Sequence, residues 1–230
     1  MESSRRRFLL AAGVTGLAAS ARGDDKKDKD KPEEEVSALE DLMREHGVLN
    51  RVLLVYEEGL RRLRSKEEIH PDVFHKTATL VRKFVEDYHE KLEENFIFPE
   101  FEKRRKQVDL IKVLCRQHEA GRRVTDVVLR LAVADQFRKE DNRKQVTAAC
   151  AAFIRMYRPH EAREDTVLFP ALHKILSTKR LQELGEQFEK EEDRLFGEEG
   201  FEKTVDQVAA IEKQLGIYDL SQFTPKSPSR

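Results

Sequence analysis

One sequence motif occurs twice in this chain and limits the possible folds more than length or composition does. "YHEKLEENFIFPEF" spans residues 88–101 and "PHEAREDTVLFPAL" spans residues 159–172. Each copy contains a His, a Glu four residues later, and then a Phe-Pro pair. Two further His residues, His46 and His118, stand 72 residues apart, which is close to the spacing of the two motifs. The chain therefore contains two similar halves.

Apolar residues recur at helical spacing through both halves. They mark four long helices within residues 36–65, 74–99, 108–131 and 146–170, and two more at 181–196 and 202–216. The 230 residues include only 10 Gly and 7 Pro, so long stretches lack helix breakers. We predict an all-α fold, an antiparallel up-down-up-down four-helix bundle made of two pseudo-repeated helical hairpins, with extra C-terminal helices.

Numbering shows which His residues lie at the same height. In an antiparallel hairpin, residues at equal height have a constant sum of sequence numbers, and both pairs, His46 with His89 and His118 with His160, are centred on a predicted turn. Residues four apart lie on one face of a helix, so each Glu of the repeated motif lies beside its His. We therefore predict that four imidazoles and two carboxylates meet in the core.

Buried carboxylates are costly unless they are paired or bound to a metal, and the sequence places no inward Lys or Arg opposite both Glu residues. Six ligands are too many for one tetrahedral zinc ion, and ferritin-like sites use four Glu and two Glu-x-x-His motifs instead. Two cations, bridged by both carboxylates and each left with an open position, fit better. The predicted metal ligands are His46, His89, Glu93, His118, His160 and Glu164.

These residues resemble the hemerythrin-like, HHE-type cation-binding family over roughly residues 36–177. The resemblance rests on the two single His residues, the two His-x-x-x-Glu motifs and the Phe-Pro after each Glu. It implies a four-helix bundle around two Fe ions, a non-heme, carboxylate-bridged di-iron centre that binds oxygen or related small molecules.

The chain departs from the oxygen-carrying members of that family in one respect. Those members have a second His four residues after the third-helix His, where this chain has Arg122, and the counterpart in the first half is Asn50. We expect these two residues to contact a ligand at the open positions; orientation toward solvent is the alternative. Family members also use an Asp five residues after the last His, and Asp165 stands there, but symmetry with Glu93 favours Glu164 as the second bridge.

The N-terminal 35 residues are predicted to lie outside the bundle. "SRRRFL" followed by an apolar run and Ala-Ser-Ala resembles a bacterial twin-arginine signal, with a general secretory signal as the alternative. We predict a signal peptide at 1–21, a charged disordered linker at 22–35, the bundle at 36–177 and a C-terminal helical extension and tail at 178–230. The protein is then exported, to the periplasm, with no stable membrane span after signal cleavage.

The balance of 43 Lys plus Arg against 44 Asp plus Glu gives no indication of a nucleic-acid partner. The leading hypothesis is an exported protein that binds or senses oxygen or a related small diatomic or peroxide ligand. Two alternatives stay open: a di-iron enzyme that decomposes peroxide or processes nitric oxide, and a protein that sequesters or delivers iron. Cys115 and Cys150 are predicted to be free thiols, and His70, His75 and His173 are not expected to be ligands.

Overall fold

The structure, a computed structural model, describes residues 36–225, and all regular secondary structure among them is helical. This confirms the all-α prediction. The predicted signal peptide and linker lie outside the described residues. Within residues 36–225 no helix is long and apolar enough to cross a membrane.

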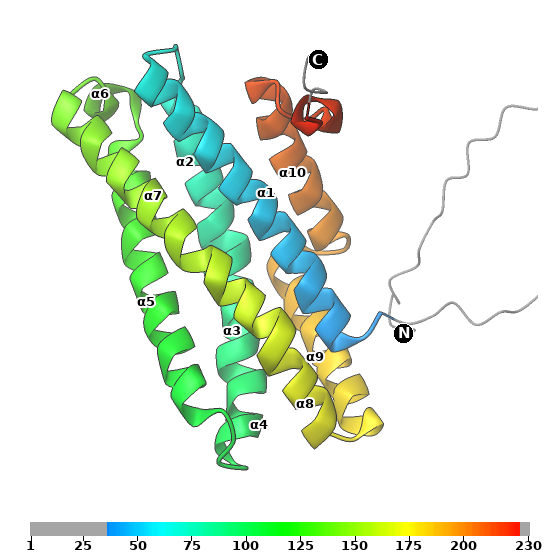
Figure 1. Ribbon diagram of the computed structural model, residues 1–230. Helices are drawn as coiled ribbons and strands as arrows, with labels where there is room; N and C mark the ends of the chain where they lie inside the picture. Colours follow the sequence, from blue (N-terminus) through cyan, green and yellow to red (C-terminus); the bar gives the residue numbers. More distant parts are fainter. Residues whose placement is uncertain (1–35, 226–230) are drawn as a thin grey trace, which may run out of the picture.

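Four long helical segments lie side by side, and consecutive segments run in opposite directions (Figure 1). The first is α1 (Ala38–Ser65) and the third is α5 (Val108–Leu131). The second and fourth are built from several pieces: α2 (Pro71–Leu80), η1 (Val81–His89), α3 (Glu90–Leu92), η2 (Glu93–Ile97) and α4 (Phe98–Glu102); then α7 (Glu140–Arg163), η3 (Glu164–Leu168) and α8 (Phe169–Ile175). α1 and α5 each pack against both composite segments, and the short α6 (Ala134–Phe137) lies in the connection before α7.

Local sequence signals set the ends of these helices. The Ser37 hydroxyl accepts a hydrogen bond from the Glu40 backbone N–H at 3.2 Å and begins α1. Lys66 adopts the left-handed conformation and ends it. The His70 ring caps the start of α2, directly before Pro71 at the first helical position, which agrees with a capping role rather than a ligand role for this His.

Two further helices, α9 (Thr178–Phe196) and α10 (Gly200–Leu215), cover one side of the molecule, against α1 and the second segment (Figure 1). Leu184 and Phe188 of α9 are fully buried. An Arg51–Glu212 ion pair with a 2.5 Å N–O separation ties α10 to α1. The short 3-10 turn η4 (Leu220–Phe223) follows α10. The two tail helices predicted from the sequence are therefore present and form part of the same core.

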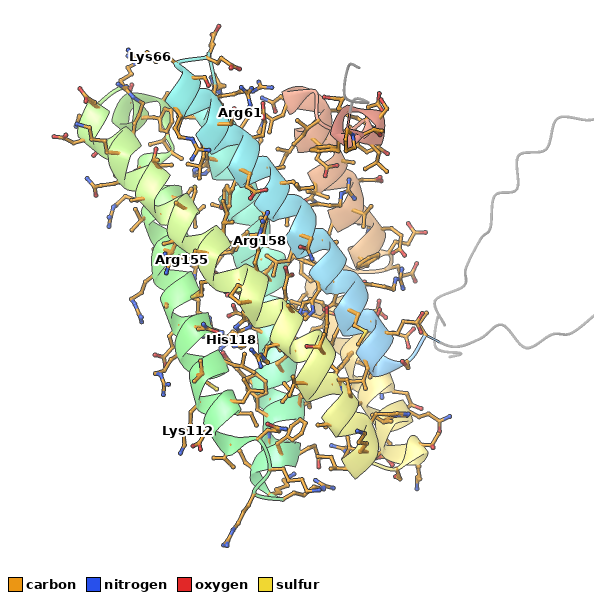
Figure 2. All side chains as sticks on the ribbon, viewed as in Figure 1. Arg61, Lys66, Lys112, His118, Arg155 and Arg158 are labelled. Carbon is orange, nitrogen blue, oxygen red and sulfur yellow. The ribbon has the colours of Figure 1, made fainter. Side chains whose placement is uncertain are left out.

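The centre of this fold holds an unusual number of buried polar side chains. Four His residues and several Glu residues are at most 6% exposed, whereas such groups are seldom buried without a partner. Figure 2 shows His118 between the helices, while the labelled Lys112 and Arg155 lie at the outer surface. The buried polar cluster is the candidate functional site.

Candidate metal centre

The four predicted His ligands form two close pairs. The Nε2 atoms of His46 and His89 are 3.1 Å apart, and those of His118 and His160 are 3.2 Å apart. Each pair joins two antiparallel segments at one height, as the numbering predicts. In each pair the two Nε2 atoms face each other at hydrogen-bond distance.

The two predicted carboxylates each reach both His pairs. One oxygen of Glu93 lies 3.9 Å from His89 Nε2 and the other lies 3.4 Å from His118 Nε2. Glu164 repeats the arrangement in reverse, with its oxygens 3.2 Å from His160 Nε2 and 3.5 Å from His46 Nε2. This is the placement that a carboxylate needs in order to bridge two cations.

All four oxygens of Glu93 and Glu164 are buried without a hydrogen-bond donor, and both side chains are 0% exposed. No Lys or Arg side chain among the described residues forms an ion pair with either carboxylate. Because unpaired buried charge costs several kcal/mol per group, a cation bound between these oxygens would stabilise the cluster. Three groups of side chains have ligand atoms close enough to hold a metal ion: Glu93, His118, His160 and Glu164; His46, His89 and Glu93; and Glu90, Glu94 and His118. The two acids of the third group already hold the Arg122 guanidinium, which leaves the first two groups as the candidates. A pair of metal ions therefore fits the residues present.

Wide helical turns position these ligands. η1 ends at His89, η2 begins at Glu93 and η3 begins at Glu164, and all three are π-helical, a form often found at functional sites. The N–H of Phe98 bonds to the Glu93 carbonyl five residues back, and the N–H of Phe169 bonds likewise to Glu164.

A Phe-Pro pair directly follows two of these three wide turns, η2 and η3, and explains their position. Pro99 and Pro170 have no backbone N–H, so neither can make the usual bond to the carbonyl four residues earlier, and their rings crowd that carbonyl. The helix responds by widening one turn, and in both halves that turn starts at the bridging Glu. The repeated motif thus contains both the candidate ligand Glu and the Phe-Pro pair that widens the helix at that Glu.

Outer hydrogen bonds fix the direction of each imidazole. Nδ1 of His89 lies 2.7 Å from Glu45 and Nδ1 of His46 lies 2.8 Å from Asp165. When Nδ1 carries the proton and donates it to a carboxylate, the Nε2 lone pair is free to bind a metal. Asp165 therefore supports His46 from outside, and the structure favours Glu164 over Asp165 as the inner carboxylate.

The other half uses the equivalent positions. Nδ1 of His118 lies 3.1 Å from Glu94, and Nδ1 of His160 lies 2.9 Å from the side-chain oxygen of Gln117. The four partners occupy two kinds of position in the sequence. Glu45 and Gln117 directly precede His46 and His118, and Glu94 and Asp165 directly follow Glu93 and Glu164. Sequence reasoning missed all four partners, although their places directly beside ligands in both copies are a detectable signal.

In the absence of a cation, the charges within the cluster are uneven. Burial lowers the pKa of His118 to about 4. Burial also acts to lower the pKa of His46, but the hydrogen bond to Asp165 and the nearby Glu164 outweigh it and raise the pKa to about 10. Burial, reinforced by the charge of Glu164, raises the pKa of Glu93 well above its ordinary value. The raised pKa favours the neutral form of the Glu93 carboxyl when no cation is bound.

Arg122 and Asn50 do not meet the cluster in the way the sequence suggests. The Arg122 guanidinium lies 2.6 Å from both Glu90 and Glu94, which hold it beside the site rather than at the imidazole nitrogens. Asn50 is exposed, and its amide donates to the backbone carbonyl of His46 at 3.1 Å. A side chain that can hydrogen-bond its own helix four residues back needs no partner in the core.

Aromatic rings enclose the cluster. Phe169 stacks on His46 and Phe98 stacks on His118, with ring centroids 5.7 and 5.8 Å apart. The Tyr157 ring lies against His160, and its hydroxyl donates to Glu90 at 2.5 Å. His173 is exposed and His75 is half-buried; both lie outside all three groups of potential ligands. Cys115 and Cys150 are free, as predicted.

Comparison with known proteins agrees with this geometry. The family model for the hemerythrin HHE cation-binding domain matches residues 37–172 and matches again at residues 109–216. The second match begins 72 residues after the first, which is the spacing of the two halves.

Uncharacterized protein Rv1995 of Mycobacterium tuberculosis and uncharacterized protein Mb2018 of Mycobacterium bovis are each 47% identical to this chain over 231 residues. The alignments cover 96% of this chain and 91% of each relative. No solved structure matches the chain significantly. On the family match and the buried His and Glu cluster together, the chain belongs to the hemerythrin HHE cation-binding family and carries a potential metal centre.

Proposed function

We propose that the chain is a hemerythrin-type four-helix bundle that holds two iron ions between its two halves. The observation that carries this proposal is the placement of Glu93 and Glu164, each with one oxygen toward each His pair. Two imidazole nitrogens and two carboxylate oxygens per ion suit iron and leave positions for an added ligand. Iron ions held here would supply electron exchange with a bound small molecule.

The ligand that fits this site is small. The six inner residues are at most 4% exposed, and Phe98, Phe169 and Tyr157 lie against the imidazoles. Dioxygen, nitric oxide and peroxide meet this limit, whereas larger substrates do not. We propose that the protein binds or senses dioxygen or such a related ligand.

A di-iron enzyme is the second candidate. The positions where an additional His would add a nitrogen ligand hold Asn50 and Arg122, and both side chains are engaged elsewhere. Each ion is thus left with fewer protein ligands and more room for exchange, which favours turnover of peroxide or nitric oxide over stable carriage. A third candidate, sequestration or delivery of iron, needs only the ligands.

One experiment separates these roles. The diferrous full-length protein is mixed with dioxygen under stopped flow, and separately with hydrogen peroxide, while absorption and peroxide loss are followed. Stoichiometric and reversible spectral change supports binding or sensing, and sustained peroxide loss supports the enzyme. Iron that leaves rapidly to a chelator, with neither response, would reject both in favour of iron storage.

Export to the periplasm by the twin-arginine route is a separate proposal, supported by the sequence "SRRRFL" alone. Replacing Arg5 and Arg6 with Lys is expected to retain the protein in the cytoplasm in a folded, iron-loaded form, because that signal is read by a receptor. Normal export of this double variant would show that a general secretory signal is used.

A further inference from the structure

The two halves of the metal centre are alike in their inner ligands but differ in the charge around them. In the half formed by His46 and His89, both outer partners, Asp165 and Glu45, are carboxylates. Neither forms an ion pair with a Lys or Arg side chain of residues 36–225. The Glu45 side chain is 1% exposed, so its charge is poorly screened by water.

The half formed by His118 and His160 has weaker outer partners. Gln117, at the position equivalent to Glu45, is a neutral amide that accepts from His160 at 2.9 Å. Glu94, at the position equivalent to Asp165, accepts from His118 at a longer 3.1 Å.

The charge of Glu94 is also neutralised from outside. Lys91 lies 2.5 Å from one of its oxygens and Arg122 lies 2.6 Å from the other. The first half therefore places on its imidazoles the buried Glu45 and the partly exposed Asp165, neither of them paired with a Lys or Arg side chain of residues 36–225. The second half places there an amide and a carboxylate that two cations already share.

A carboxylate that accepts the Nδ1 proton makes the imidazole a stronger donor at Nε2, and added negative charge near an ion stabilises its more oxidised state. A neutral amide does so much less. Resting on the proposed iron pair, we propose that Gln117 and Glu45 make the two iron positions unequal: the His46–His89 position retains ferric iron, and the His118–His160 position is reduced first. One electron taken from a reductant such as a reduced viologen, which is thereby oxidised, converts one ferric ion to ferrous at the second position.

Two nearly isosteric substitutions test each half separately. Gln117→Glu supplies the missing carboxylate to His160, and Glu45→Gln removes the carboxylate from His89. Both are made in the full-length, iron-loaded protein, which is reduced stepwise without oxygen at saturating iron while Mössbauer and electron paramagnetic resonance spectra are recorded. Gln145→Glu, on the exposed face of α7, is the matched control for a change of one charge.

The wild type is expected to accept its two electrons in two resolved steps. Gln117→Glu should lower the potential of the step that occurs first, Glu45→Gln should raise the potential of the second step, and each should bring the two steps closer. Gln145→Glu should move neither step.

A single unresolved two-electron step in the wild type, an unchanged separation in both variants, or movement of the opposite step in either variant would overturn the inference. All three results leave the proposed iron pair intact. Failure of the wild type to bind two iron ions would instead reject the proposed function, and this inference with it.

Discussion

Replacing Glu93 with Gln should change stability in opposite directions in the metal-free and metal-loaded protein. In the metal-free protein both oxygens of Glu93 are buried without a hydrogen-bond donor, and Glu164 lies close by. In the proposed metal-loaded protein the same oxygens would face two cations. A Gln side chain has nearly the same shape and no charge, so it removes a cost in the first state and a ligand in the second.

The expected gain in the metal-free protein is about 2 kcal/mol at pH 6, because folding keeps this carboxyl protonated at a cost of about 1.4 kcal/mol for each pH unit above its ordinary pKa. The raised pKa of Glu93 sets its pH dependence. A carboxyl whose pKa is raised by folding is most compatible with the folded state at low pH and becomes costly as pH rises. The advantage of the Gln variant should therefore be larger at pH 8 than at pH 5. With iron present, loss of the bridge should weaken metal binding at least tenfold, about 1.4 kcal/mol.

The assay is urea unfolding followed by circular dichroism, with a chelator and, separately, with ferrous iron under anaerobic conditions. Glu102→Gln, at an exposed position in α4, is the control and should change the free energy of unfolding little in either condition. If Glu93→Gln destabilises the metal-free protein as much as the iron-loaded one, the carboxylate has a structural role and the reasoning about an orphaned ligand is wrong.

Three further variants test neighbouring parts of the molecule. Gly121→Ala should cost about 2 kcal/mol, because its Cβ would lie 2.2 Å from the Tyr157 hydroxyl, and thermal unfolding measures this. Burial raises the pKa of Glu86 to about 7, so the wild type loses folding stability as pH rises from 4.5 to 7. Glu86→Gln lacks this loss, and its free energy of unfolding should rise relative to wild type by at most about 3 kcal/mol over that range. Urea unfolding across the same pH range measures the difference. Pro99→Ala together with Pro170→Ala should restore regular helical turns and lower iron affinity roughly tenfold or more by competition with a chelator.

The sequence predicts that the inner residues lie close together because two independent arguments, helix-face spacing and equal height in a hairpin, agree. Residues four apart share a helix face, and equal height in a hairpin follows from numbering, so His89 and Glu93 can be placed without coordinates. The Nε2–Nε2 distances agree with that reasoning. Doubling of the motif adds a second, consistent placement of the same kind.

The outer partners and the two side chains expected at the open positions are harder to predict. Arg122 is on the helix face that the sequence indicates, but its long side chain follows the carboxylates of Glu90 and Glu94, and periodicity does not identify the partner of a flexible side chain. Asn50 bonds its own backbone, an option open to any Asn in a helix. The π-helical turns depend on how the helix relaxes before Pro99 and Pro170. The repeated Phe-Pro predicts a disturbed helix there, but not which kind of turn results.

The most direct test of the account is the metal content of the protein purified with iron available, combined with Mössbauer spectroscopy of the air-exposed form. The placement of Glu93 and Glu164 between two His pairs predicts close to two iron ions per chain, coupled to each other through shared ligands. One zinc ion per chain, or iron that behaves as isolated single ions, would contradict the central claim that these two carboxylates bridge a pair of irons.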